Sequence, residues 1–397
     1  MSQFQSRREL FDLPDGITYL DGNSLGPLPK AAAERARQTI ADQWGPMLIT
    51  GWNKAKWMEL PARLGDRIGQ LIGAPAGSTI VGDTLSIKVY QAVASSLELR
   101  PDRKIVLSDS GNFPTDLYMA KGLLDSLGKG HELKVVAPEA VSDAINERVA
   151  VVMLTQVDYR TGRLHDMKAI TEKAHANGAL IIWDLAHSAG ALPIDLTACN
   201  ADFAVGCTYK YFNGGPGAPA FIHVRPDLID KARPALSGWL GHAAPFAFDL
   251  DYRPGDGITR MRVGTPPVIQ MAVLDAALDA FDGIDMAELR SRSIELSEQF
   301  IAEVEADCKD VKLASPRDAH ARGSQVSFQF SEGYAAMQAL IARGIIGDFR
   351  APDIMRFGFC PLYNTPEDVS RAASALCEII ATGEWDQPVF KTRHAVT

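Results

Sequence analysis

The sequence lacks the features that mark several classes of protein. Its five cysteines form no C-x-x-C pair, and their odd number does not suit a disulfide framework, so we expect a reducing compartment, the cytoplasm. No run of about 18 apolar residues is present to cross a membrane, and the N-terminus develops no apolar stretch of a secretory signal. No Walker A sequence and no H-E-x-x-H motif occur, and the eight histidines show no metal-ligand spacing, so we expect no catalytic metal.

Positive charge is also scarce. Lysine and arginine together number 40 against 49 aspartates and glutamates, and the net charge of −9 argues against a nucleic-acid partner. The 397 residues, 46% of them hydrophobic and 22% charged, suit a globular protein of about two to three domains. These features favour a protein that acts on a small molecule, with neither nucleic acid nor a membrane as its partner.

Short apolar runs alternate with amphipathic segments in the first half of the chain. We expect strands at Ile80–Val81, Lys104–Leu107, Leu133–Val136, Val149–Leu154, Ala179–Trp183 and Phe203–Val205. Helical patterns separate most of them, over Ser86–Leu97, Thr115–Leu127 and Met167–Asn177. Strands that are separated by helices of this length imply crossover connections, so the pattern predicts an α/β domain with a mainly parallel sheet.

The pattern changes beyond Pro266. Long helices are expected over Val268–Phe281 and Met286–Val304, and these are followed by a strand at Val326–Phe330 and by helices over Ala335–Ala342 and Glu367–Ile380. The sequence therefore predicts a large domain over residues 45–265 and a smaller α+β domain over 266–397, which the N-terminal segment 1–44 joins.

Two residues carry the strongest chemical signal. Asp184 ends an apolar strand, where ligands bind in open α/β folds, although an Asp at this place also commonly caps a helix. Lys210 follows a second strand and precedes a glycine-rich run; burial there would make its neutral amine available for a Schiff base, whereas a loop lysine is ordinarily exposed. Together they suit pyridoxal phosphate, because the Asp keeps the pyridine nitrogen protonated.

The chain resembles the kynureninase family, which belongs to the class V aminotransferase group of pyridoxal-phosphate enzymes. The resemblance rests on Tyr19–Pro27, Asn112–Asp116, Asp184–Gly190, Tyr209–Gly215, Ser237–His242, Gly264–Pro267 and Arg356–Asn364. It implies the PLP-dependent transferase fold of type I, in which a mainly parallel sheet carries helices on both faces. It also implies a homodimer with shared active sites.

The resemblance implies a reaction in tryptophan catabolism, the hydrolysis of the Cβ–Cγ bond of L-kynurenine to anthranilate and L-alanine, with 3-hydroxykynurenine as an alternative substrate. Lys210 would carry the cofactor and remove the Cα proton, with Asp184 on the ring nitrogen. Tyr209 would donate a proton near Cβ or the γ-oxygen, or contact the phosphate instead. Further cofactor contacts would come from Leu85, Ser86, Phe113, Asp116, Thr155, His187, Trp239 and Thr265.

Several of these positions have a structural alternative. Phe113 would stack on the cofactor ring or be a core aromatic, and Ser86 would face the phosphate or cap its helix. His187 would contact the ring hydroxyl or the phosphate, although a lone histidine is more often structural. Trp239 and Thr265 would reach the partner subunit's site. Some relatives carry Asn at the position of Thr265, and the hydroxyl of Thr265 has a shorter reach than that amide.

Three residues are expected to contact the substrate. Arg356 lies in an apolar strand that rarely tolerates an unpaired guanidinium, and its planar fork suits the carboxylate of an amino acid better than a structural salt bridge. Trp52 would lie against the substrate ring, or else be a buried Trp at a domain seam. Ser24 would help to form the substrate pocket, or else simply sit in a turn.

Other functions stay open at this point. Gly22–Gly26 matches the G-x-S-x-G elbow of serine hydrolases around Ser24, but prolines follow it where a helix should begin. A cysteine desulfurase or aminotransferase would share the fold, and a desulfurase needs a mobile catalytic cysteine. Cys360 stands between Phe359 and Pro361, which indicates a packed side chain.

Overall fold

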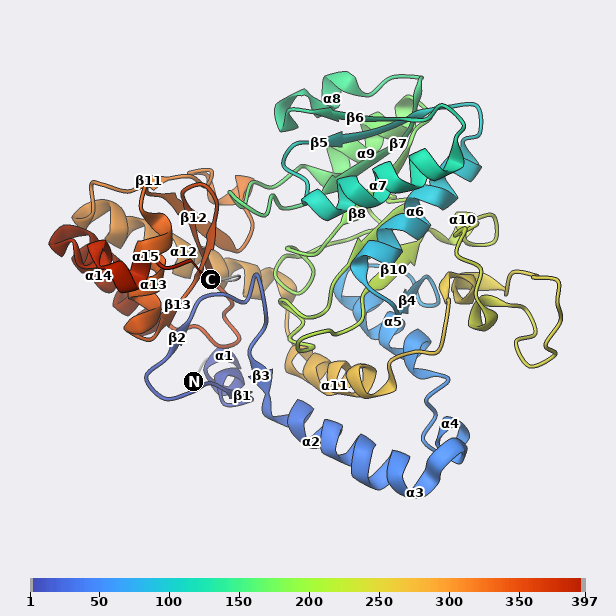
Figure 1. Cartoon of the computed structure of the whole chain (residues 1–397), viewed down its shortest axis with the longest axis horizontal. Helices are drawn as coiled ribbons and strands as arrows, with labels where there is room; N and C mark the ends of the chain where they lie inside the picture. The colour runs from blue at the N-terminus through green and yellow to red at the C-terminus, as the bar shows by residue number, and fades with distance from the viewer. Residues whose placement is uncertain (1–2, 394–397) are drawn as a thin grey trace.

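The computed structural model describes residues 3–393, which form two bodies built around separate sheets (Figure 1). The larger body holds a seven-stranded sheet, and the smaller body holds a four-stranded antiparallel sheet. The N-terminal segment links them, because its strand β2 (Thr18–Tyr19) pairs in parallel with β13 (Ile345–Ile346), late in the chain.

The large sheet has the strand order β4-β10-β9-β8-β7-β5-β6. Its strands are β4 (Thr79–Val81), β5 (Ile105–Asp109), β6 (Glu132–Val136), β7 (Val149–Thr155), β8 (Leu180–Asp184), β9 (Phe203–Gly206) and β10 (Phe221–Val224). The strands from β9 to β6 run parallel to one another, whereas β10 runs antiparallel to both of its neighbours. The predicted mainly parallel sheet is confirmed, and each predicted apolar run falls on one of these strands.

Strand β10 is the one that the sequence pattern does not predict. Its four residues follow the proline- and glycine-rich run 214–219, and His223 interrupts their apolar character. All four residues are nevertheless buried, because β10 fills the space between β4 and β9. Pairing with sheet neighbours therefore decides this strand, since its local sequence is too short to specify it.

Helices cover both faces of the large sheet, as the fold class predicts. Alternate strand residues point to opposite faces, so Val106 and Leu107 of β5 belong to different cores. The face of Val106 is covered by α6 (Leu85–Leu99) and α7 (Pro114–Leu127). The face of Leu107 is covered by α5 (Leu60–Leu71), α9 (Met167–Ala176) and α11 (Val268–Leu278).

The smaller body packs three helices on its antiparallel sheet. The strand order is β11 (Lys312–Leu313), β12 (Gln325–Gln329), β15 (Ile354–Gly358) and β14 (Asp348–Arg350). The helices are α12 (Met286–Asp307), α13 (Gly333–Ala342) and α14 (Pro366–Thr382). Leu20 from the N-terminal segment is fully buried in this core, so the first residues of the chain complete the smaller body.

Helix α11 lies just after the predicted domain boundary at residue 266. Its side chains Met271, Leu274 and Leu278 nevertheless join the core beneath the large sheet. Asp275 of α11 also pairs with Arg63 of α5, at 2.8 Å. These contacts group α11 with the larger body, and the division of the chain at residue 266 stays a prediction.

Shorter elements complete the chain: α1 (Gln3–Arg8), β1 (Phe11–Asp12), β3 (Leu28–Pro29), α2 (Lys30–Gln38), α3 (Gly45–Met47), α4 (Gly51–Lys54), α8 (Val141–Ala144), α10 (Pro226–Ile229) and α15 (Pro388–Lys391). Helices α2 to α4 form an arm at the lower edge of the molecule in Figure 1. Within residues 3–393, no helix combines the length and the apolar character that a membrane span needs.

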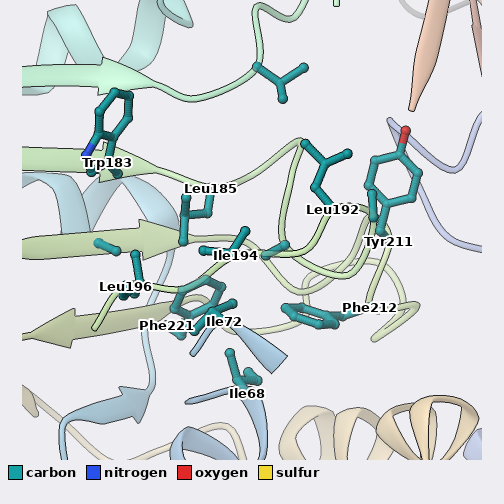
Figure 2. Close-up of a cluster of buried hydrophobic side chains, with 14 of the residues drawn as sticks. Ile68, Ile72, Trp183, Leu185, Leu192, Ile194, Leu196, Tyr211, Phe212 and Phe221 are labelled. Atoms are coloured by element: carbon teal, nitrogen blue, oxygen red, sulfur yellow. The ribbon is translucent and has the colours of Figure 1, made fainter. Parts of the chain in front are cut away.

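The segment that carries Lys210 is anchored in the core. Tyr211 and Phe212 follow the lysine directly, and both side chains are almost fully buried. In Figure 2 their rings lie in one apolar cluster with Leu192 and Phe221. Because its two neighbours are fixed in this way, the backbone of Lys210 has a defined position at the edge of the sheet.

Candidate functional site

A cavity of ≈ 310 Å³ lies where the carboxyl ends of the large sheet meet the smaller body. Its walls come from the N-terminal turn, the first turns of α6 and α7, the end of β8, the lysine segment and the β14–β15 hairpin. The lining residues are Asn23, Ser24, Leu85, Ser86, Phe113, Thr115, Asp116, Tyr159, Asp184, Ala186, His187, Tyr209, Lys210, Arg350 and Arg356. Segments that lie far apart in the chain thus meet at one site.

Most of the residues that the sequence singles out line this cavity. They are Ser24, Leu85, Ser86, Phe113, Asp116, Asp184, His187, Tyr209, Lys210 and Arg356. The others, Trp52, Thr155, Trp239 and Thr265, do not line it in the described single chain.

The residues outside the cavity have other surroundings. Thr155 is buried at the end of β7, and its hydroxyl donates to the carbonyl of Val157 at 3.2 Å. Trp52 is half-buried and packs edge-on against Trp57, with ring centroids 5.6 Å apart. Trp239 and Thr265 are exposed to solvent, and a single chain does not test their expected role in a partner subunit's site.

Lys210 faces a neutral histidine. Its Nζ lies 2.9 Å from His187 Nε2. Burial, together with the positive charge of Lys210, holds the pKa of His187 well below its usual value, so the imidazole is neutral. Its Nε2 therefore accepts a hydrogen bond from the lysine, and the buried Nδ1 finds no partner within residues 3–393. That unsatisfied nitrogen is a donor for a bound ligand.

Two buried carboxyl groups, Asp184 and Asp116, share one proton. Burial and the charge of Asp184 raise the pKa of Asp116 well above its usual value, and a hydrogen bond joins the two side chains. Burial also raises the pKa of Asp184, but Lys210 and the backbone N–H of Ala186, at 2.8 Å, stabilise its charged form. Asp116 therefore holds the proton and Asp184 carries the negative charge.

The first turn of α6 offers free backbone donors. Thr84 precedes this 15-residue helix, and its side chain does not cap the first N–H groups. Leu85 and Ser86 line the cavity at this point, so an anionic group there would meet unsatisfied N–H groups and the positive end of the helix dipole. Tyr209 also lines the cavity; the neighbouring Cys207 and burial raise its pKa, so the phenol stays protonated.

A network of charged side chains forms the wall at the smaller body. The Nε of Arg356 donates to Asp348 at 2.6 Å, and its Nη2 donates to Ser24 Oγ at 2.9 Å. Its Nη1 donates to the carbonyl of Tyr159. The sequence left a choice between a carboxylate-binding arginine and a structural ion pair, and the structure shows that Arg356 has the ion pair while it also lines the cavity.

Sequence reasoning missed several lining residues, above all Tyr159 and Arg350, and also Asp348, the partner of both arginines. A signal for Asp348 and Arg350 was present, because alternate residues of a strand share a face. Two charged residues at alternate positions, beside a strand that carries Arg356, suggest a polar wall. Nothing in the local sequence around Tyr159 indicates its place.

The cavity fits pyridoxal phosphate. The unsatisfied Nδ1 of His187 and the open first turn of α6 offer donors to polar groups of a ligand, and Asp184 offers a buried negative charge. Lys210 supplies the amine, and Phe113 at the start of α7 is partly exposed beside Tyr159, with ring centroids 5.2 Å apart. An acceptor for a ring nitrogen, donors for a phosphate and an amine for a carbonyl therefore meet in one place.

The competing functions find less support in this geometry. The described partners of the Ser24 hydroxyl are Asp348, Arg356, Arg350 and Asp21, and no histidine is among them to act as a base. Cys360 is buried, and burial raises the pKa of its thiol to about 12, which is unsuited to a nucleophile. A larger cavity of ≈ 540 Å³ between α1, α12 and α14 is lined by none of the predicted site residues.

Known proteins resemble this chain over almost its entire length. The family model for the kynureninase C-terminal domain matches residues 289–376. A kynureninase of Pseudomonas fluorescens is 49% identical over 397 residues, which covers 98% of this chain and 95% of that protein. A kynureninase of Burkholderia pseudomallei (strain K96243) is 48% identical, with the same coverage.

Solved structures share the fold at lower identity. The cysteine desulfurase CsdA of Escherichia coli matches with a TM-score of 0.80 and 19% identity, over 96% of this chain and 99% of that chain. A C-DES variant with glycine covalently linked to its PLP cofactor matches with a TM-score of 0.80 and 18% identity, over 94% and 99% of the two chains. These matches establish the fold of type I PLP-dependent enzymes.

Proposed function

The chain belongs to the kynureninase family, and on that premise we propose how the residues of its cavity share the work of one reaction. The reaction is the hydrolysis of the Cβ–Cγ bond of L-kynurenine, which yields anthranilate and L-alanine. The observation that carries the assignment of roles is the meeting of Lys210, Asp184 and Arg356 in one cavity.

Pyridoxal phosphate is the cofactor, and when bound it withdraws electrons from the amino-acid substrate. In our proposal Lys210 holds it through its amine and Asp184 keeps the proton on its ring nitrogen. Phe113 lies against the ring face, and the first turn of α6 binds the phosphate through Leu85 and Ser86. The uncapped start of α6 and the buried charge of Asp184 support this placement.

The proton transfers fall to two neighbouring residues in this scheme. Lys210 removes the proton from Cα of the substrate, and the neutral His187, 2.9 Å away, holds the lysine side chain in place by accepting its hydrogen bond. Tyr209 donates a proton near Cβ or the γ-oxygen. Its raised pKa supports this role, because a phenol that stays protonated at neutral pH has a proton to give.

The substrate is held at the wall of the smaller body. Arg356 binds the α-carboxylate of kynurenine, because its guanidinium lines the cavity and is fixed by Asp348. Ser24 donates or accepts one further hydrogen bond beside it. In this proposal Trp52 contacts the substrate ring and Thr155 contacts the cofactor, although in the single chain Trp52 packs on Trp57 and the Thr155 hydroxyl donates to the Val157 carbonyl.

A homodimer would complete the site. Trp239 and Thr265 would then reach the partner subunit's cofactor, and large apolar side chains on the surface support a partner there. Trp44, Leu48 and Ile49 are exposed on the arm, and Phe246 and Phe248 are exposed on the loop that follows Trp239. We also propose a cytoplasmic location, because the five cysteines are all free thiols.

Anthranilate fluorescence tests the proposed function directly. Purified protein that has been loaded with pyridoxal phosphate should release anthranilate from L-kynurenine, and a parallel trial with 3-hydroxykynurenine would decide the preferred substrate. Lys210→Ala should lose at least about 1000-fold in kcat, because the amine that moves the Cα proton is gone. Lys231→Ala, on the exposed surface, should keep full activity. Normal turnover by Lys210→Ala would contradict the assignment.

A further inference from the structure

The β14–β15 hairpin places three charged side chains on one face. Asp348 of β14 stands directly opposite Arg356 of β15, and Arg350 follows two residues after Asp348. Because alternate strand residues share a face, all three lie on the side of the cavity, whereas Phe349 joins the core of the smaller body. The hairpin therefore presents two guanidinium groups to the cavity, and the buried carboxylate of Asp348 is paired with both of them.

Arg356 has little hydrogen-bonding capacity left for a substrate. A guanidinium has five N–H groups. In this structure the carboxylate of Asp348 accepts hydrogen bonds from the Nε–H and from one Nη2–H of Arg356. The hydroxyl of Ser24 accepts the other Nη2–H, and the carbonyl of Tyr159 accepts one Nη1–H. One N–H of Nη1 remains, whereas a carboxylate has two oxygens to satisfy. A second donor on the same wall is needed to bind both.

Arg350 is placed to supply that donor. Its guanidinium lines the same cavity and shares the carboxylate of Asp348, with Nη2 to Oδ2 at 2.9 Å. Its Nη2 is also 3.4 Å from Ser24 Oγ, the hydroxyl that Arg356 contacts. Its Nε has no hydrogen-bond partner in the part of the chain that the structure describes, and a third of the side chain is exposed. Arg350 thus still has N–H donors to offer a ligand, whereas nearly all of those of Arg356 are already in hydrogen bonds.

The charged side chains of this wall also favour the binding of an anionic ligand. Arg350 and Arg356 carry two positive charges against the one negative charge of Asp348. Asp21 lies next to them, and burial and the charge of Asp348 raise its pKa well above the usual value, which reduces the negative charge that it adds. The two guanidinium groups thus line the cavity with one carboxylate paired to both, and the carboxylate of an amino acid would supply a second negative charge.

We propose that Arg350 is a second substrate-binding arginine, which binds the α-carboxylate of the substrate together with Arg356 while Asp348 pairs with both guanidinium groups and offsets their mutual repulsion. The inference rests on the proposed role of Arg356. It assigns one carboxylate oxygen to the remaining N–H of Arg356 and the other to Arg350. A ligand without the carboxylate gains nothing from Arg350.

A comparison of two small amines tests this inference without turnover. L-Alanine, the amino-acid product, carries the carboxylate, and L-alaninamide lacks its charge; both titrate the visible absorbance of the cofactor-loaded protein. Arg350→Gln should raise the Kd of L-alanine about 10- to 100-fold, the effect of losing a charge-assisted hydrogen bond. The Kd of L-alaninamide should change less than about 3-fold. Arg292→Gln, on the surface of α12, should change neither value.

Each outcome decides the matter. An equal rise in Kd for both amines would make Arg350 a structural residue, and an unchanged Kd for L-alanine would remove it from the site. If Arg350→Gln does not load the cofactor, Arg350→Lys answers instead, because it keeps the charge but loses the planar fork. It should weaken L-alanine binding selectively, by less than Arg350→Gln would. Failure of the wild-type protein to cleave kynurenine would overturn the proposed function and leave this binding comparison intact.

Discussion

At the scale of single residues, the buried pair of Asp116 and Asp184 shows how surroundings divide two identical groups. Both carboxyls are buried, and burial raises the pKa of each. Lys210 favours the ionised form of both carboxyls, but Asp184 also accepts a hydrogen bond from the backbone N–H of Ala186. The negative charge of Asp184 raises the pKa of Asp116, which therefore keeps its proton. The pair carries one negative charge in place of two.

This division predicts unequal effects of the same substitution. Asp116→Asn replaces a neutral group by a neutral group and should lower kcat/KM for kynurenine by about 10-fold or less. Asp184→Asn removes the charge that holds the ring proton and should lower it by at least about 100-fold. Anthranilate fluorescence measures both variants, after their cofactor content has been equalised from absorbance. The reverse order of the two effects would contradict the assignment of the proton.

The sequence predicts the two residues at the centre of the site because each stands at a strand end. Asp184 closes an apolar run, and Lys210 follows another, so the parallel sheet alone brings them to one edge. Tyr159 and Arg350 reach the cavity from a loop and from a hairpin of the smaller body, and their positions depend on how the two bodies pack. The alternation of Asp348 and Arg350 indicates that they share one face of a strand, but no pattern along the chain shows that this face meets the cavity.

At the scale of elements, strand β10 brings a buried histidine into the large sheet. His223 is almost fully buried, and its Nδ1 lies 3.1 Å from Ser78 Oγ beside β4. Burial lowers the pKa of His223 to about 4, because the charged imidazolium would lose its hydration there. The unfolded chain has no such penalty, so the two states bind protons differently.

Acid should therefore destabilise the protein through this strand. The folded-state pKa of about 4 lies below the usual value of 6.5, so the contribution of His223 is fully present above about pH 7 and is lost as the pH falls toward 4. Linkage gives a loss of about 2 kcal/mol in unfolding free energy between pH 7.5 and pH 5. His223→Gln should show a smaller loss over this range in urea titrations. An equal loss in the variant and the wild type would exclude His223 as the cause.

The helices and strands differ in how far their own local sequence specifies them. The strands β7 and β8 are continuous apolar runs, and the helices α12 and α14 are long, so local patterns predict them. Strands β10 and β14 have four and three residues, too few for a periodic signal, and they form because a neighbouring strand pairs with them. The membership of α11 in the larger body likewise follows from packing.

At the scale of the whole molecule, the exposed apolar side chains on the arm support a partner subunit. Leu48 and Ile49 are 65% and 77% exposed, which is costly for side chains of this size on a free surface. The arm lies along the lower edge of the molecule in Figure 1, below α11, with which α2 is paired through Arg35 and Asp275. A second copy of the chain that covers these side chains would also bring its own Trp239 and Thr265 to the site, as the family resemblance implies.

A charge on the arm should separate the subunits. Ile49→Glu would place a carboxylate in the apolar contact, and sedimentation should change from about twice the chain mass of 43.0 kDa to the mass of one chain. Activity should fall with the dimer, because the site would lose the partner's contribution. Val389→Glu, at a side chain of similar exposure on α15, is the control and should leave both mass and activity unchanged. A dimer that persists in Ile49→Glu would place the interface elsewhere.

The pairing of β2 with β13 has a consequence for the order in which the protein is made. Thr18 leaves the ribosome early, whereas its partner Ile345 is among the last residues to appear. All seven strands of the large sheet have been synthesised by Val224, and α11 by Leu278. The larger body can therefore form before the smaller body, whose core buries Leu20, is complete. A nascent chain that stops before the β14–β15 hairpin would hold Asp184 and Lys210 but no arginine wall. The part of the chain that is made last would therefore also supply the two arginines to which we assign the carboxylate of the substrate.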